Sequence, residues 1–327
     1  AQESWVQTGR RGDLAVDSNG NMIVADFNNN RVLTYAPDGT HVRTRFSEYV
    51  PAPFTDPNVD PDMLLSGVFQ YDVNYDAGPN YGEWQLTHNW RPTDGEFFDI
   101  GGFNLRRRLS NGQDYIYSLD TAGGVVVYAL EPSGMRRSAI IGADTEGLWN
   151  WTDTDGDGLV QESETLDFAG PESSSSFSTL APGTWVDHEG NFWIADWDYW
   201  TDEGQTVKVP LLGFDNQGNP LYDWSNRETV VPEDVAYEFD ANNLRVSPAT
   251  GEVYVLGTTV RNRDFGGLFW MGGTAVDHRA PDGSRIGLMH ISEVVVAMAT
   301  DNSGDYFYTG HSGSFNGRGQ HWIRMYT

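Results

Sequence analysis

The chain has 327 residues, of which 47 are Asp or Glu and 20 are Lys or Arg, so its formal net charge at pH 7 is −27. This charge argues against nucleic-acid binding, which needs a basic patch that faces the phosphates, and against attraction to anionic membranes. Cysteine is absent, which excludes disulfides, thiolate metal sites and a cysteine nucleophile. The length suits one large all-β domain or two ordinary domains.

The first predicted elements form a β-hairpin over residues 14–26, which read LAVDSNGNMIVAD. Alternating apolar residues on both sides of a tight Gly turn are typical of two antiparallel strands. A related pattern recurs along the chain at residues 105–120, 185–196, 244–256 and 298–310. In most of these repeats a third strand and a Gly turn follow, at residues 32–39, 125–134, 207–218 and 274–283, and a fourth strand comes next.

Four antiparallel strands in each repeat predict the blades of a β-propeller. Five clear repeats and a divergent one near residues 63–96 predict six blades, with seven as the alternative, in one domain over residues 1–327. The last blade ends near residues 322–326, and we expect a strand from residues 4–7 to close it. The longest apolar runs, such as residues 294–299, are far shorter than the roughly 20 residues of a membrane span, so no membrane insertion is expected.

The first repeat, LAVDSNGNMIVADFNNNRVLTYAPDGT, resembles an NHL repeat. It has the inner strand, the Asp-x-x-Gly-Asn turn, Val-Ala-Asp and Asn-Arg-Val, and later repeats keep only the first half of this pattern. The resemblance implies an NHL-type propeller, a group that includes protein- and RNA-binding modules, a zinc-dependent amidating lyase and relatives of calcium-dependent lactonases. The sequence shows no equivalent of the lyase histidines or the lactonase metal carboxylates, and fold alone does not give function.

Residues 153–164 read DTDGDGLVQESE, which matches the 12-residue calcium loop of an EF-hand. Glycine at the sixth position, Gly158, suits a turn with positive φ, and the apolar Val160 is expected to pin the loop. The predicted calcium ligands are Asp153, Asp155, Asp157, the backbone carbonyl of Leu159, Gln161 and Glu164. The alternative is an acidic, solvated turn without a metal.

The segments that flank the loop are too short for the regular helix pair of an EF-hand. We therefore expect one loop inserted into the propeller, within residues 143–178, and a structural ion instead of a sensor, since a sensor needs a helix pair that opens. In a secreted chain without disulfides, calcium would supply the missing cross-link.

Loop lengths predict where binding occurs. The turns after the first and third strands of each repeat are short, and strand alternation places both sets at one end of the propeller. The long connections are then expected at the opposite end, the calcium loop among them, and long loops on a rigid scaffold commonly carry function. These connections are residues 47–62, 142–178, 197–206, 224–240, 258–273 and 311–321.

The long connections are rich in aromatic and charged residues, a combination that can stack on sugar rings and bind their hydroxyl groups. The alternative is that the aromatic rings pack the loops together. The predicted ligand-binding residues are Trp197, Tyr199, Trp200, Arg261, Arg263, Trp270, His311, Arg318 and His321.

The leading functional hypothesis is a secreted or extracellular recognition or assembly protein that contacts carbohydrate or another extracellular protein. The sequence begins Ala1-Gln2 without Met, as a mature chain does after a leader is removed, and the periplasm is the alternative compartment. Exposed aromatic residues also suggest self-association. The rival hypothesis is a polysaccharide lyase or hydrolase with its site at the propeller axis, where Asp202, Glu203 and Asp264 could supply paired carboxylates.

Overall fold

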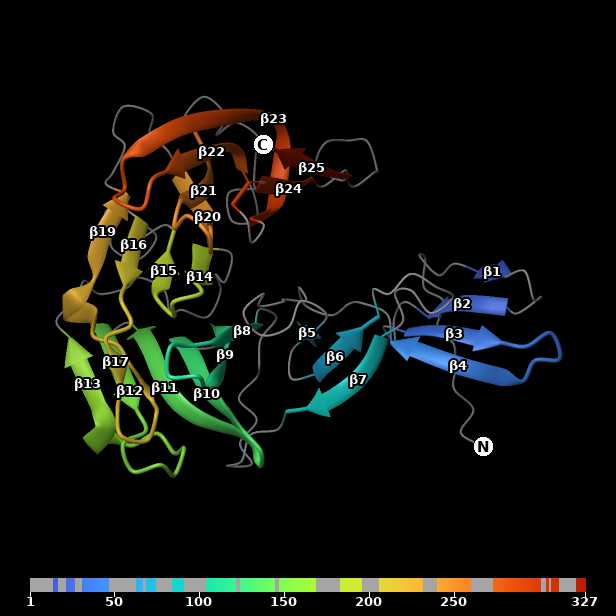
Figure 1. The fold of residues 1–327 in the computed structure, drawn as a ribbon, viewed down its shortest axis with the longest axis horizontal. Coiled ribbons are helices and arrows are strands. Elements are labelled where there is room, and N and C mark those ends of the chain that lie inside the picture. The colour runs from blue at the N-terminus through green and yellow to red at the C-terminus, as the bar shows by residue number, and fades with distance from the viewer. Residues whose placement is uncertain are drawn as a thin grey trace.

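The computed structural model shows an all-β chain of antiparallel sheets, with short 3₁₀ turns and no α-helix among the residues that it describes (Figure 1). None of the helical segments in this described part has the length and apolarity to cross a membrane. The described residues are 14–16, 22–26, 31–46, 63–66, 69–74, 84–90, 104–121, 124–144, 147–168, 183–195, 206–231, 240–259, 273–300, 304–305, 307–311 and 322–327.

The first sheet confirms the hairpin predicted over residues 14–26, because Leu14 pairs with Val24 and Val16 with Met22. Its four strands follow one another in space as in sequence. They are β1 (Leu14–Val16), β2 (Met22–Asp26), β3 (Arg31–Tyr35) and β4 (His41–Phe46). The divergent repeat forms a three-stranded sheet of β5 (Met63–Ser66), β6 (Phe69–Val73) and β7 (Trp84–Asn89).

The third sheet has six strands in the order β13-β12-β11-β10-β9-β8. The four predicted strands are β8 (Asn104–Arg108), β9 (Asp114–Thr121), β10 (Gly124–Glu131) and β11 (Gly134–Asp144). The sequence analysis missed β12 (Gly147–Thr152) and β13 (Thr165–Phe168), which extend the outer edge of the sheet. β12 pairs with the free edge of β11 along its whole length, and its Leu148 and Trp151 are buried.

The fourth sheet contains β14 (Thr184–Val186), β15 (Phe192–Ile194), β16 (Thr206–Val209) and β19 (Glu228–Val231). The third strand predicted at the start of residues 207–218 is shorter in the structure, because β16 ends before Pro210, which has no N–H to donate to a ladder. Between β16 and β19 the chain forms a small hairpin of β17 (Gly213–Phe214) and β18 (Pro220–Leu221), then the 3₁₀ turn η5 (Trp224–Asn226).

The fifth sheet joins the two C-terminal repeats through one long strand. Its strands are β20 (Asp240–Val246), β21 (Val253–Thr258), β22 (Gly273–Arg279), β23 (Arg285–Thr300), β24 (Phe307–His311) and β25 (Trp322–Tyr326). The first half of β23 pairs with β22 and the second half with β24. Two separately predicted blades are therefore continuous here, and the number of blades stays a prediction.

From the second sheet to the fifth, consecutive sheets contact one another near their first strands, with β5 against β8, β9 against β14 and β14 against β20. One buried apolar cluster lies between the third and fourth sheets and includes Leu105, Tyr117, Val186 and Trp224. Another joins the fourth and fifth sheets through Trp193 and Leu244. Sheets that pack face to face in chain order fix the positions of the turns at their ends.

The pairing of β11 with β12 gives a testable prediction. Gly142 lies opposite Trp149, and a Cβ added at Gly142 would overlap the Trp149 ring. We expect Gly142→Ala to lower the free energy of unfolding by about 1–3 kcal/mol, as overpacking does, measured by urea denaturation. Gly287→Ala in β23 is the control, since no atom lies within 4 Å of its added Cβ; equal losses for both variants would contradict the β11–β12 contact.

Candidate metal centre

The acidic loop at residues 153–164 connects β12 to β13 at the outer edge of the third sheet. Strands flank it instead of helices, and its last residues form the 3₁₀ turn η2 (Glu162–Glu164). Trp151 of β12 is fully buried and packs with Ile116 and Tyr128, while its Nε1 donates to Glu164 Oε2 over 3.0 Å. The loop is thus anchored at both ends to the sheet, as expected for an inserted loop without an EF-hand helix pair.

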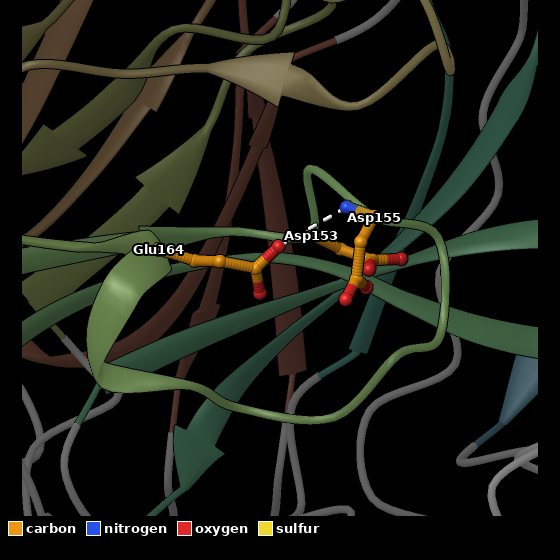
Figure 2. Close-up of side chains that lie close together, drawn as sticks. All are labelled: Asp153, Asp155 and Glu164. Atoms are coloured by element: carbon orange, nitrogen blue, oxygen red, sulfur yellow. Dashed lines mark hydrogen bonds between the residues drawn. The ribbon is translucent and has the colours of Figure 1, made fainter.

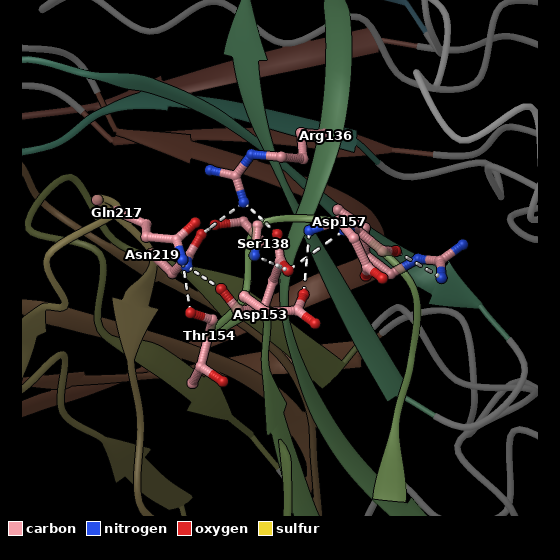
Figure 3. Close-up of polar contacts among 12 residues, drawn as sticks. Arg136, Ser138, Asp153, Thr154, Asp157, Gln217 and Asn219 are labelled. Carbon is pink, nitrogen blue, oxygen red and sulfur yellow. Dashed lines mark hydrogen bonds and ion pairs between the residues drawn. The ribbon is translucent and has the colours of Figure 1, made fainter. Parts of the chain in front are cut away.

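Asp153, the first predicted ligand, is completely buried. Its Oδ1 accepts hydrogen bonds from the backbone N–H groups of Gly156 at 2.9 Å and Gly158 at 3.2 Å. Gly158 has φ of 75°, so the positive φ predicted for this position is confirmed. The other oxygen, Oδ2, forms an ion pair with Arg136 of β11 (Figure 3).

Glu164, the last predicted ligand, reaches back across the loop. Its Oε1 accepts from the backbone N–H of Thr154 at 2.7 Å, the Thr154 hydroxyl at 2.6 Å and the backbone N–H of Asp155 at 3.1 Å. Carboxylate oxygens of Asp153, Asp155 and Glu164 all lie within 4.8 Å of one another (Figure 2). The structure therefore brings together three of the predicted ligands.

The remaining predicted ligands lie beside this cluster. Gln161 Nε2 donates to Asp155 Oδ2 at 2.9 Å and to Asp157 Oδ2 at 3.2 Å, and Leu159 N donates to Asp157 Oδ1 at 2.7 Å. The coordinating role of the Leu159 carbonyl stays a prediction. The expectation that Val160 pins the loop is wrong, because its side chain is 46% exposed and packs into no described core cluster.

The donor set fits a hard divalent cation. Four carboxylates, a glutamine amide and a backbone carbonyl offer oxygen only, which calcium prefers. Each carboxylate oxygen has two lone pairs. Asp153 Oδ1 and Glu164 Oε1 are fully used by hydrogen bonds, so the acceptors left for a metal are on Asp153 Oδ2 and Glu164 Oε2. Burial alone would lower the pKa of Arg136, but hydrogen bonds from it to Glu131 and Asp153 raise that pKa, so Arg136 stays charged and neutralises one carboxylate.

Side chains from the turn of the β17–β18 hairpin complete the surroundings of the loop (Figure 3). Asn219 Nδ2 donates to the carbonyl oxygen of Asp153, and Gln217 Nε2 donates to that of Thr154. Asn219 Oδ1 accepts from Ser138 Oγ at 2.7 Å and from Arg136 Nη1 at 2.8 Å. The sequence analysis missed these residues, because nothing in the local pattern links residues 215–219 to a loop more than sixty positions earlier.

These contacts correct the predicted position of the loop. The turn after β8 donates from Gln113 to Leu130 O at the end of β10, so the two short-turn sets do share one end of this sheet. The acidic loop lies at that same end, against the turn at residues 215–219, and not at the opposite end, where the loop lengths predicted it. The physical reason is β12, an additional strand that carries the chain back across the sheet before the loop begins.

The predicted ligand-binding residues lie outside the described residues, so the carbohydrate-binding surface stays a prediction. Only the backbone of His311 is described, at the end of β24, where it pairs with Val295 and Trp322. The others are Trp197, Tyr199, Trp200, Arg261, Arg263, Trp270, Arg318 and His321. The candidate carboxylates Asp202, Glu203 and Asp264 also lie outside the described residues.

No protein-family model matches the sequence, and no curated protein is similar to it. Among solved structures, a luciferin-regenerating enzyme is 10% identical with a TM-score of 0.45, over 97% of this chain and 91% of that one. Regucalcin, a calcium-binding protein from Agrobacterium tumefaciens, is 11% identical with a TM-score of 0.42, over 96% and 88%. A gluconolactonase from Xanthomonas campestris is 12% identical with a TM-score of 0.42, over 90% and 80%. These TM-scores are too low for the likenesses to carry an argument about function.

Proposed function

We propose that this chain is a secreted, calcium-stabilised β-propeller that serves in extracellular recognition or assembly. The observation that carries the calcium role is the position of Asp153. Its carboxylate belongs to the acidic cluster and its carbonyl accepts from Asn219 of the β17–β18 hairpin. A cation held by Asp153, Asp155 and Glu164 would therefore fix the outer edge of the third sheet against this hairpin.

A structural ion is favoured over a sensor. The loop is bonded to β11 through Arg136 and to the β17–β18 hairpin through Asn219 and Gln217. A calcium sensor converts binding into the opening of a helix pair, and the described segments on both sides of the loop are strands of one sheet. Calcium would thus act on stability and on the rigidity of this edge.

The propeller proposal is supported by the order of the sheets. Antiparallel meanders follow one another along the chain, and the second to fifth sheets meet near their first strands, as blades do around a common axis. Six blades, one domain over residues 1–327 and an NHL-type relationship belong to this proposal. So do an extracellular compartment and a carbohydrate or protein partner contacted by the long loops.

The calcium prediction is tested by thermal unfolding and calorimetric titration of the metal-free protein. We expect calcium to raise the melting temperature, since a ligand at a hundred times its Kd adds about 2.7 kcal/mol to the stability of the native state. Glu164→Gln should weaken calcium binding by at least about tenfold, because it removes a charged ligand that can give two oxygens. Glu162→Gln is the matched control, an exposed neighbour outside the cluster. An unchanged melting temperature after chelation would refute the calcium role.

The recognition role is tested by incubation with acidic and neutral polysaccharides, with and without calcium. We expect the protein to be depleted from solution by at least one polysaccharide without release of small products. Small products detected by mass spectrometry would contradict this role and identify an enzyme instead. The absence of both depletion and products would contradict carbohydrate recognition. Protein assembly would then be the remaining role, and light scattering would test it.

A further inference from the structure

One arginine already holds the carboxylate oxygen that a cation in the acidic loop would need. Arg136 of β11 pairs through Nη1 with Asp153 Oδ2, and its Nε donates to Glu131 Oε1 at 2.8 Å. The other oxygen of Asp153 accepts the backbone N–H groups of Gly156 and Gly158. Oδ2 is therefore the oxygen of Asp153 that is left for a metal, and the guanidinium of Arg136 points toward this carboxylate (Figure 3).

A guanidinium and a divalent cation on the same oxygen oppose each other. Two positive charges a few ångströms apart repel, and the repulsion is stronger where little water screens it. Asp153 is completely buried and the side chain of Arg136 is 12% exposed, so water screens this position poorly. Arg136 thus neutralises Asp153 when no metal is bound, and its charge opposes a metal that binds the same oxygen.

The structure offers the arginine a second position. Glu131 lies at the end of β10, its side chain is 35% exposed, and it already accepts from Arg136 Nε. Asn219 Oδ1, a further acceptor of the guanidinium at 2.8 Å, also accepts from Ser138 Oγ at 2.7 Å. Once a cation holds Asp153, the departure of Arg136 would leave neither Asn219 nor Asp153 unpaired, as buried polar groups require.

We propose that Arg136 is an internal counter-ion, which calcium displaces from Asp153 toward Glu131. This inference rests on the proposed calcium site and describes how that site is regulated. Without metal, the arginine keeps the buried carboxylate paired and the loop attached to β11. With metal, the guanidinium retains its ion pair with Glu131. The arginine thereby stabilises the metal-free loop and lowers its affinity for calcium, so the site is suited to surroundings in which calcium is abundant.

Substitutions of the two partners should change calcium affinity in opposite directions, as measured by calorimetric titration of the metal-free protein. We expect Arg136→Gln to bind calcium about tenfold more tightly than the unchanged chain, because the competing cation is removed. Glu131→Gln should bind it about threefold more weakly, because the displaced guanidinium loses its other carboxylate. Glu131→Gln keeps the pair between Arg136 and Asp153, so it tests the exchange even if Arg136→Gln does not fold in EGTA.

The double variant separates the exchange from a general effect of charge. If Glu131 acts through Arg136, Glu131→Gln should change calcium affinity by less than about twofold in a chain that already carries Arg136→Gln. Effects of the two substitutions that simply add would indicate long-range electrostatics and overturn the proposal. Asp282→Asn is the control, since it removes an exposed negative charge from the turn between β22 and β23, and it should leave calcium affinity unchanged.

The outcomes distinguish this inference from the calcium proposal itself. If the unchanged chain binds calcium and Arg136→Gln binds it equally or more weakly, the arginine does not compete with the metal, and the exchange is overturned while the calcium site stands. Binding by Arg136→Gln alone would contradict both proposals, because the arginine would then replace the metal permanently. Absence of binding in every variant would also refute both.

Discussion

We expect Asp153→Ala to lower the free energy of unfolding by about 3–5 kcal/mol even when no metal is present. Asp153 is completely buried, and its carboxylate both pairs with Arg136 and accepts from the backbone of Gly156 and Gly158. The substitution leaves the half-buried Arg136 without one of its two carboxylate partners, and breaking a buried ion pair in this way costs about this amount. Urea denaturation in EGTA measures the loss.

Asp155→Ala is the matched control for this prediction. Asp155 belongs to the same cluster but its side chain is exposed, so in EGTA its substitution should cost less than about 1 kcal/mol. In calcium both variants should lose the stabilisation that the metal gives. Equal losses for the two variants in EGTA would show that the buried ion pair contributes little and that the two aspartates act only as metal ligands.

The sequence predicts only those residues of the metal site that lie close together along the chain. Asp153, Asp155 and Glu164 lie within one 12-residue loop, where spacing and a glycine with positive φ determine the backbone path. Arg136 approaches the same aspartate from β11, and Asn219 approaches it from the turn of the β17–β18 hairpin. Their contribution depends on which sheets are neighbours, and no spacing rule contains that information.

The same distinction applies to the fold. Turns of the Asp-x-x-Gly-Asn type were predictable because each one is self-contained: Asp187 Oδ1 accepts from the backbone of Glu189 and Asn191, and Asp215 Oδ1 accepts from that of Asn219. Strand β12 was not predicted, because its assignment depends on the free edge of β11, which is a tertiary feature. Because β12 was missed, the metal loop was predicted at the wrong end of the sheet. Each added strand changes the end of the sheet at which the next loop emerges.

The second large effect is expected for Trp224→Ala, which should lower the free energy of unfolding by about 3–5 kcal/mol. Trp224 is completely buried between the third and fourth sheets and contacts Phe192 edge to face, with ring centroids 6.3 Å apart. Its Nε1 donates to the carbonyl oxygen of Trp149 in β12 over 3.2 Å. Truncation removes the largest side chain at this contact and leaves a cavity that surrounding strands can fill only in part. Chemical denaturation is the measurement.

Two further variants show whether packing or the hydrogen bond accounts for the stability lost in Trp224→Ala. Trp224→Phe keeps most of the ring and loses the bond to Trp149, so we expect a loss of about 1–2 kcal/mol from the missing hydrogen bond and the smaller ring. Leu212→Ala lies in the same connection between β16 and β19, but its side chain is 50% exposed. This substitution should change the free energy of unfolding by less than about 0.5 kcal/mol. Calcium affinity should persist in Trp224→Ala, because Arg136 and Asn219 still hold Asp153. A Trp224→Ala protein as stable as Leu212→Ala would mean that the third and fourth sheets are not packed through this residue.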